Sequence, residues 1–385
     1  MKWLPAENDL VGEQGKVREK VKTENGNIYV SGFPGSGKSV CLLYSAKTIR
    51  DIDPNAKILF VEFTHSLIKM IEAALKELKL DNIKVVTFED FKWHNHGPFD
   101  YIICDEVQDS SAGYLDIMKQ RAKRVIVGGD PNQSIYLELP NGEPTIDVNG
   151  MKAILNPSTS ELTIIHRLNK YVINAIRSFM PDMKILAEKS SMLKKHKPVY
   201  IWKFHDDIEE TKKIMEDANA SINMGESVAI LLPTRNSIEK FVNTYLTALN
   251  KTTFDFKANK HPKFNRPDYG KLNIYLNNLG IKMQCVTNGY GNLVTDSDKI
   301  ILCTYQSSKG LDFDKVFIPF CNPGFGFSDD ERLFMVAMSR SRKDLILSYS
   351  VKPNRFIESF INNRQACQLM DQTIENNNNS EDDDW

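Results

Sequence analysis

Hydrophobic residues in the first third of the chain form short β-branched runs separated by segments with helical spacing. The segments KSVCLLYSAKTIR and SLIKMIEAALKELKL carry apolar residues every three to four positions, as amphipathic helices do. The strand-like runs around them are NIYVSG (27–32), KILFVEF (57–63), KVVTF (84–88), YIICD (101–105) and RVIVGG (124–129). This alternation predicts a parallel sheet covered by helices.

The pattern breaks at residues 139–160, which are rich in Gly, Pro, Asn and Ser, and resumes with strand-like runs from PVYIWKF (198–204) to DLILSYS (344–350). We therefore expect an α/β fold with two tandem domains, residues 1–150 and 160–365, each a mainly parallel sheet flanked by helices. Residues 366–385 end in ENNNNSEDDDW, and this acidic, low-complexity tail is predicted to be disordered.

Composition narrows the class of protein. Apolar residues at 41% and charged residues at 26% are typical of a soluble globular chain, and no run approaches the roughly 18 apolar residues of a membrane span. The first residues lack the apolar core of a signal peptide, and the six cysteines form no CxxC pair, which favours a cytoplasmic location. With a net charge of −1, any nucleic-acid site must be a local patch.

The stretch SGFPGSGKSV contains the spacing GxxxxGK[ST] between an apolar strand and a helix, where a phosphate-binding loop belongs. Glycines let the backbone N–H groups face a phosphate, and the helix N-terminus adds a favourable dipole. Lys38 would reach the terminal phosphates and Ser39 would bind Mg²⁺. The alternative, a glycine-rich turn that binds nothing, is disfavoured by the strand and helix on either side. The expected ATP-binding residues here are Gly32, Phe33, Pro34, Gly35, Ser36, Gly37, Lys38, Ser39 and Val40.

Three acids follow the apolar run in YIICDEVQD (101–109). In P-loop enzymes a strand near the loop ends in an acid that holds magnesium, and Asp105 suits that role. Glu106 would then polarise the attacking water. A solvated acidic loop is the alternative, and the upstream P-loop argues against it.

DEVQD resembles the second motif of the UvrD/Rep-like group of superfamily 1 helicases. Further segments resemble that family's motifs in its order, from residue 10 to residue 342. They are LVGEQ (10–14), FTHS (63–66), VGGDPNQSIY (127–136), LTIIHR (162–167), TYQSSKGLDF (304–313) and ERLFMVAMSRSR (331–342). The resemblance implies two tandem RecA-like P-loop domains and an ATP hydrolase that uses ATP and Mg²⁺.

The resemblance also implies roles for individual residues. Gln14 would bind the adenine, His166 would pack on it, and Asp312 would bind the ribose. Hydrolysis would be carried by Lys38, Glu106, Gln133, Arg167 and Arg340, with both arginines closing over the phosphates. Single-stranded nucleic acid would contact Phe63, Thr64, His65, Tyr136, Thr304 and Gln306.

The departures from the family concern mainly strand contacts. Glu138 and Leu139 lie near the positions where the family has an aromatic–arginine pair. His166 stands in place of the family's tyrosine, Gln306 in place of its histidine, and Asp312 in place of its glutamate. The family's large accessory insertions are also missing, so a minimal two-domain motor is expected. Because base stacking contributes about 1–3 kcal/mol per base, the loss of an aromatic position weighs against duplex unwinding.

Three segments are candidate partner surfaces. Residues 251–271 interleave aromatic and basic side chains, so they would grip a single strand, unless the aromatics belong to the core. Residues 184–203 are basic, which is more typical of a solvated face. The acidic tail ending in Trp385 would dock on a protein partner, keep the chain soluble, or mask its own basic groove.

Two functions remain open on the sequence. The first is a nucleic-acid-stimulated ATPase that acts as a translocase or helicase on single-stranded DNA, or alternatively on RNA, and hydrolyses ATP at the interface of its two RecA-like domains. The second is an ATP-driven conformational switch, regulated by a protein partner and without strand unwinding.

Overall fold

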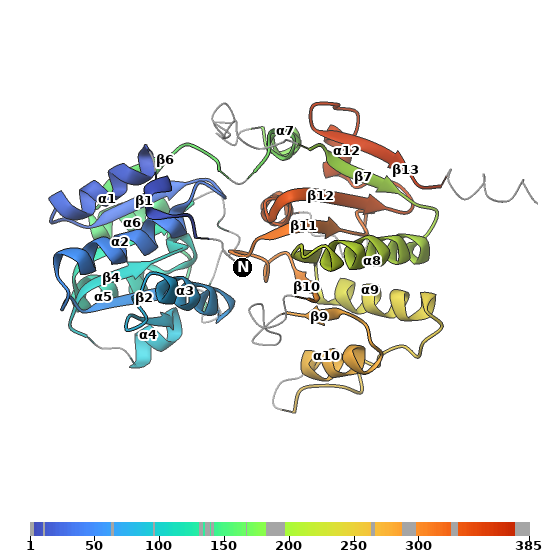
Figure 1. Cartoon of the computed structure of the whole chain (residues 1–385), viewed down its shortest axis with the longest axis horizontal. Coiled ribbons are helices and arrows are strands. Elements are labelled where there is room, and N and C mark those ends of the chain that lie inside the picture. The colour runs from blue at the N-terminus through green and yellow to red at the C-terminus, as the bar shows by residue number, and fades with distance from the viewer. Residues whose placement is uncertain are drawn as a thin grey trace, which may run out of the picture. The chain divides into compact units, whose positions relative to one another are not determined.

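The structure is a computed structural model. It describes residues 4–10, 12–62, 65–94, 97–130, 134, 139, 142–166, 168–181, 197–262, 266–286, 298–324 and 330–373, with the side chains of residues 65 and 66 left out. The chain folds into two compact units, and the boundary between them falls between residues 167 and 168. Figure 1 shows the first unit in blue to green and the second in green to red.

The first unit is built on a six-stranded, fully parallel sheet with the order β3-β2-β4-β5-β1-β6. Its strands are β1 (Ile28–Gly32), β2 (Ile58–Glu62), β3 (Lys84–Thr87), β4 (Phe99–Cys104), β5 (Ala122–Gly129) and β6 (Ser158–Leu162). Helix α1 (Glu13–Thr23) precedes the first strand. Parallel strands need crossovers, and the helices between these strands are α2 (Lys38–Ile52), α3 (His65–Glu77), α4 (Phe88–His94), α5 (Ala112–Arg121) and α6 (Val148–Leu155). Two short 3₁₀ turns, η1 (Glu7–Asp9) and η2 (Val107–Asp109), complete the described elements of this unit.

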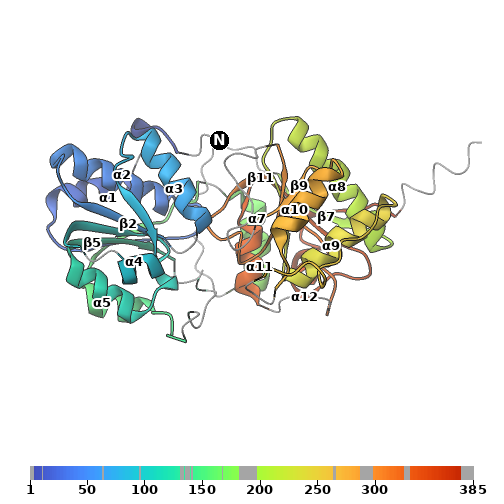
Figure 2. The same ribbon diagram turned by 90° about the horizontal axis from the view of Figure 1, so that it is seen from below.

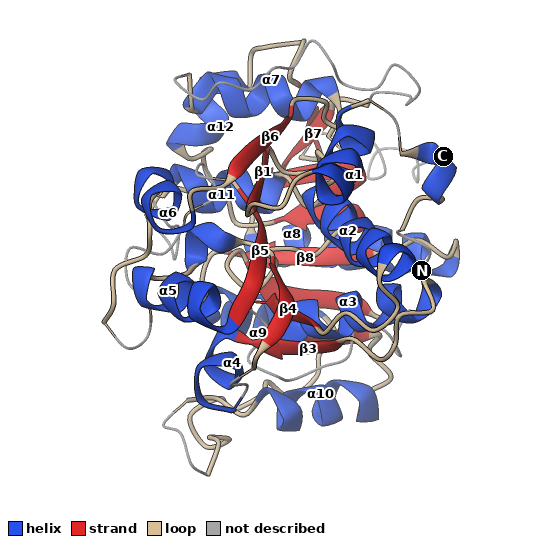
Figure 3. Cartoon of the chain, turned by 90° about the vertical axis from the view of Figure 1, so that its left-hand side faces the viewer, coloured by secondary structure: helices blue, strands red, loops and turns tan. Residues whose placement is uncertain are grey.

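Both faces of this sheet are covered, as Figure 3 shows with α1, α2 and α3 on one side and α5 and α6 on the other. Side chains alternate between the faces along each strand. Val30 therefore joins the core under α1, α2 and α3, while its neighbour Tyr29 joins the core under α4, α5 and α6. Burial on both faces explains why the inner strands β1, β2, β4 and β5 appear in the sequence as mostly apolar runs.

The second unit contains a seven-stranded parallel sheet with the order β13-β7-β12-β11-β8-β10-β9. Its strands are β7 (Val199–Lys203), β8 (Val228–Leu232), β9 (Met283–Cys285), β10 (Ile300–Thr304), β11 (Phe313–Ile318), β12 (Ser341–Tyr349) and β13 (Cys367–Asp371). Its helices are α7 (Lys170–Phe179), α8 (Asp207–Asn223), α9 (Arg235–Ala248), α10 (Tyr269–Asn278), α11 (Glu331–Met338) and α12 (Arg355–Phe360).

Polar side chains start the helices of the second unit. Asp206, Asp268 and Asp330 each accept hydrogen bonds from two backbone N–H groups in the first turn of the helix that follows. These N–H groups have no partner inside the helix, so the caps fix where α8, α10 and α11 begin. Helices α8, α9 and α10 then cover one face of the sheet, while α7 packs against α11 and α12 (Figure 2).

The predicted fold class, two α/β domains with parallel sheets flanked by helices, is confirmed. The expected boundaries differ from the structure at two places. Residues 158–162, which were expected to span the end of a linker and the start of the second domain, form β6, which pairs with β1 and extends the first unit. Residues 367–371, expected to be disordered, form the edge strand β13, which pairs with β7. Among the described residues, no helix has the length and apolarity needed to cross a membrane.

Candidate nucleotide-binding site

The loop between β1 and α2 has the backbone that a phosphate-binding loop requires. Gly35 and Gly37 have φ angles of 80° and 93°, in the region that favours glycine. A Cβ atom at Gly37 would lie 2.3 Å from Gln14 Nε2, and one at Gly32 would lie 2.9 Å from Leu162 Cβ. The loop is therefore closely surrounded, and α2 begins directly after it with Lys38.

Lys38 lies at the first turn of α2 with only 7% of its surface exposed. Its Nζ donates to Gly32 O at 2.8 Å and lies 3.5 Å from Phe33 O. The ammonium group is thus held over the loop, at the helix N-terminus, where negative charge is favoured. This is the position expected of a lysine that contacts phosphates.

Asp105 follows the end of β4 and is 4% exposed. The Ser39 hydroxyl donates a hydrogen bond to Asp105 Oδ2, so the two expected magnesium ligands are in direct contact. Burial, and after it the charge of Glu106, raises the pKa of Asp105, while the Ser39 hydroxyl and Lys38 oppose that rise. Gly128 on β5 leaves room for this carboxylate, because a Cβ there would lie 3.0 Å from Asp105 Oδ1.

Glu106 has a φ of 52°, in the left-handed region that non-glycine residues seldom adopt. Gln108 Nε2 donates to its carboxylate, and Gln108 Oε1 accepts from the backbone N–H of Asp130 at 3.1 Å. Gln108 thus joins Glu106 to the end of β5. Sequence reasoning gave Gln108 no role, because this link depends on two strands meeting at one edge of the sheet.

The oxygen ligands at this site suit magnesium. A hydroxyl and a carboxylate are hard ligands, and Mg²⁺ commonly takes one or two of these together with substrate phosphates and water. Within the described part of the chain, no group of three or more His, Cys, Asp and Glu side chains is placed to hold a metal. Ser39 and Asp105 supply two oxygen ligands, as a metal that shares its coordination with a bound nucleotide requires.

Gln14 and His166 both contact the phosphate loop. Gln14, on α1, is buried and donates from Nε2 to Ser36 O at 3.3 Å. The backbone N–H of His166 donates to Gly35 O at 2.9 Å. Both residues expected to surround the adenine therefore contact the phosphate loop, although they lie 152 positions apart in the sequence.

Glu13, which sequence reasoning also missed, lies beside Gln14. Its carboxylate accepts hydrogen bonds from the backbone N–H of Thr163 at 2.6 Å and of Ile164 at 3.3 Å, and from the Thr163 hydroxyl. LVGEQ contains this residue, but nothing in that segment alone shows its partner.

In the second unit, Arg340 and Asp312 are neighbours. Arg340 is 2% exposed, and its guanidinium donates to Val336 O at 2.9 Å, Ser339 Oγ at 2.8 Å and Leu311 O at 3.4 Å. Phe313 N donates to Arg340 O at 3.0 Å, so the residues on both sides of Asp312 are bonded to Arg340. Thr304, at the end of β10, is buried, and Gln306 is exposed.

Comparison with known families agrees with this geometry. The family described as the viral superfamily 1 RNA helicase core domain matches residues 28–224, just over half of the chain. The chain belongs to superfamily 1 of the helicases. The family described as the UvrD-like helicase C-terminal domain matches residues 263–352. The predicted superfamily is confirmed. The activity as a helicase-type ATP hydrolase and the UvrD/Rep-like DNA helicase group stay predictions.

More distant likenesses are weak. One matching solved structure is the arterivirus nonstructural protein 10 (helicase), with 16% sequence identity and a TM-score of 0.44. That match covers 90% of this chain, and this chain spans 64% of the length of the arterivirus helicase. The likeness is too low to support an argument. No curated protein matches the chain.

Several residues expected in this helicase site lie outside the described residues: Gln133, Arg167, Phe63, Thr64 and Tyr136. His65 begins α3, but its side chain is not described. Residues 182–196, which hold most of the second basic segment, and the tail from residue 374 to Trp385 also lie outside. Their predicted roles stay predictions.

The aromatic–basic segment 251–271 is not the open stacking surface that one interpretation expected. Phe254 and Phe256 are 7% and 5% exposed, and Tyr269, inside α10, is fully buried. All three belong to the core under α8, α9 and α10. For these residues the strand-gripping interpretation is wrong, and the alternative, aromatics packed into the core, is confirmed.

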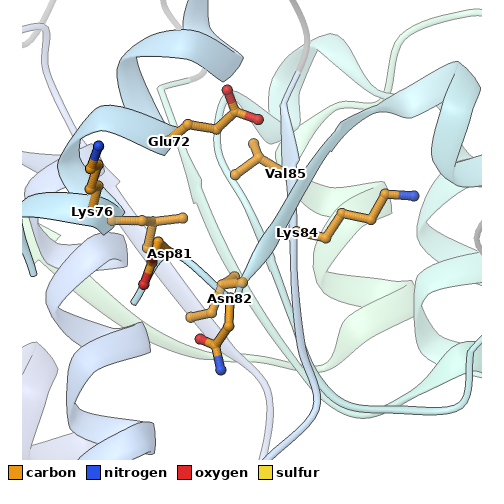
Figure 4. A pocket seen from close by; sticks show the side chains of 8 residues that line it. Glu72, Lys76, Asp81, Asn82, Lys84 and Val85 are labelled. Carbon is orange, nitrogen blue, oxygen red and sulfur yellow. The ribbon is translucent and has the colours of Figure 1, made fainter. Parts of the chain in front are cut away.

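A surface hollow of about 450 Å³ lies between the C-terminal half of α3 and the start of β3 (Figure 4). Two acids, Glu72 and Asp81, and two lysines, Lys76 and Lys84, line it. It lies at the N-terminal end of β3, whereas the phosphate loop follows the C-terminal end of β1. Because the strands are parallel, the N-terminal and C-terminal ends of the strands lie on opposite sides of the sheet. The hollow is therefore not the nucleotide site.

Proposed function

We propose that this superfamily 1 helicase is a nucleic-acid-stimulated ATPase that translocates along a single strand. The observation that carries the proposal is the convergence of Lys38, Ser39, Asp105 and Glu106 at one edge of the first sheet. These side chains come from two strand–loop junctions, and each is a type that phosphoryl transfer uses.

In this proposal Lys38 and the loop N–H groups bind the β- and γ-phosphates, and Gln14 and His166 hold the adenine. Ser39 and Asp105 would hold Mg²⁺, which supplies charge neutralisation for the phosphates. Glu106 orients and polarises the attacking water, a contribution of about 10²–10⁴-fold. Gln108 keeps Glu106 in place through its bond to Asp130 N.

Further residues are proposed to complete the nucleotide site and to bind the strand. Arg340 and Arg167 are proposed to stabilise charge on the transferred phosphate, and Asp312 to bind the ribose. Gln133 would sense the terminal phosphate. Phe63, Thr64, His65, Tyr136, Thr304 and Gln306 are proposed to contact the strand. This division of roles follows the family motifs.

The UvrD-like motifs lead us to propose single-stranded DNA as the nucleic acid that is bound, and RNA is the alternative. The family match to residues 263–352 is to a UvrD-like domain, and the longer match is to an RNA helicase core. All six cysteines are free and buried, which suits the proposed cytoplasmic location.

One observation favours the second candidate, a conformational switch driven by ATP and regulated by a protein partner. Leu139, near a position where the family stacks a base, is 7% exposed and belongs to the core under α4, α5 and α6. A side chain packed in the core is not available to a nucleic-acid base. In this case the acidic tail ending in Trp385 is the proposed docking element.

ATP hydrolysis by the purified chain, with and without single-stranded DNA or RNA, tests the proposal. Glu106→Gln and Lys38→Ala should each lower the rate at least about 100-fold. Asp100→Asn is the matched control, because Asp100 lies at the start of β4, the strand that the two acids follow, and its ion pair with Lys123 is on the surface. Strong stimulation by one polymer identifies the track, whereas slow hydrolysis indifferent to both would contradict translocation and favour the switch.

A further inference from the structure

Glu13 links two segments that lie far apart in the sequence. It is the first residue of α1, and its carboxylate accepts from two consecutive backbone N–H groups, those of Thr163 and Ile164, and from the Thr163 hydroxyl. Hydrogen bonds to an ionised carboxylate are stronger than neutral ones. Glu13 thus fixes the start of α1 against the chain that leaves β6.

Each of the two linked segments also contacts the phosphate loop. Gln14, the next residue of α1, donates to Ser36 O, and His166, three residues beyond Thr163, donates from its backbone N–H to Gly35 O. The contacts form a closed circuit from Gly35 through His166 and Thr163 to Glu13, and through Gln14 back to Ser36. All of these residues belong to the first unit.

We propose that Glu13 is a positioning residue for base recognition, which sets the separation between Gln14 and His166 and thereby the slot for the adenine. The inference rests on the proposed function, because it requires that the loop binds ATP. It assigns to Glu13 a role in choosing adenine over guanine, with no contact to the phosphates or to the attacking water.

The chemistry of the link predicts how substitutions differ. Glu13→Ala removes all acceptors for the two N–H groups. Glu13→Gln keeps one carbonyl oxygen for them, and its NH₂ group can donate to the Thr163 hydroxyl, which then accepts. The conservative variant should therefore restore most of what the alanine variant loses.

Direct binding of fluorescent ADP and GDP tests this inference without requiring hydrolysis or nucleic acid. Glu13→Ala should weaken ADP binding about tenfold and bring the ADP-to-GDP affinity ratio close to one. Glu13→Gln should stay within about threefold of the wild type. Glu24→Ala is the matched control, because Glu24 caps the other end of α1 and accepts from Ser158 at the start of β6, away from the phosphate loop.

Hydrogen exchange at the Thr163 and Ile164 amides gives a second readout, and it should quicken in Glu13→Ala but not in Glu24→Ala. An unchanged ADP-to-GDP affinity ratio in Glu13→Ala, including equal loss of affinity for both nucleotides, would overturn the positioning role.

If Glu13→Ala does not fold, Thr163→Val replaces it as the test, because it removes only the hydroxyl donor. Thr163→Val should lower the same affinity ratio, and an unchanged ratio would overturn the role. A wild type that binds neither nucleotide would instead refute the proposed function.

Discussion

At the scale of single residues, Glu210 is a buried carboxyl group in the second unit. Its Oε1 accepts from Phe320 N at 2.7 Å and from Ser348 Oγ at 2.6 Å, while Oε2 has no hydrogen-bond partner in the described structure. Burial raises the pKa of Glu210 to about 7, although these two bonds and Lys240 oppose the rise and Asp207 adds to it. An ionised Glu210 therefore destabilises the folded chain.

The sign of the resulting pH dependence follows from linkage. The folded state keeps a proton on Glu210 that the unfolded state loses near pH 4.5, so this stabilisation is complete below that pH and is lost as pH rises to about 7. The loss is on the order of 3 kcal/mol. Glu210→Gln should flatten this part of the stability curve, as measured by urea unfolding between pH 4.5 and 8. An equal slope in the variant and the wild type would show that other groups cause it.

At the scale of elements, the two ends of β1 differ in how much space they leave for a side chain. Gly32, at the C-terminal end, lies under the phosphate loop, where a Cβ would meet Ser36 Oγ at 2.4 Å and Leu162 O at 3.1 Å. Gly26, just before the strand, has nothing within 4 Å of an added Cβ. Only the end that carries chemistry is too crowded for a side chain.

Gly32→Ala and Gly26→Ala form a matched pair for this element. We expect Gly32→Ala to weaken ADP binding at least about tenfold, because overpacking of this kind costs about 1–3 kcal/mol and shifts the loop backbone. Gly26→Ala should bind ADP as the wild type does. Isothermal titration of both variants measures the effect, and equal affinities would show that the loop adapts to a side chain at Gly32.

At the scale of the whole molecule, the proposed chemistry is divided between the units. Lys38, Ser39, Asp105 and Glu106 belong to the first, whereas Arg340 belongs to the second and is held there by backbone carbonyls. Arg124 provides a comparison, because it is 6% exposed and donates to Gly26 O, Val21 O and Lys20 O within the first unit.

Substitution of these two arginines separates catalysis from stability. Both Arg340→Ala and Arg124→Ala remove a buried guanidinium with backbone partners, so both should lower the melting temperature. Only Arg340→Ala should also lower ATP hydrolysis per folded molecule, by about 10³-fold, with ADP affinity nearly unchanged. Equal hydrolysis by the two variants would exclude a role for Arg340 in phosphoryl transfer.

Local patterns in the sequence predicted much of the fold. Most inner strands of both sheets are buried on two faces, so their apolar runs are visible without tertiary information, as in RVIVGG for β5. The phosphate loop was predictable because its glycines, Lys38 and Ser39 lie next to one another. The strand β6 was missed because it is Ser-Thr-Ser-Glu-Leu, a mostly polar edge strand with only Leu162 buried. Likewise β13 is short and largely exposed.

The sequence by itself thus determined the α/β class, the phosphate loop, the acids after β4 and the superfamily. Each of these depends on neighbouring residues or on the order of motifs. The tertiary structure alone decided that Glu13 binds Thr163, that Gln108 holds Glu106, and that Phe254 and Phe256 lie in the core. The physical reason is that such contacts depend on which strands and helices meet in the fold. Partners such as Glu13 and Thr163 lie 150 positions apart along the chain, so no local pattern connects them.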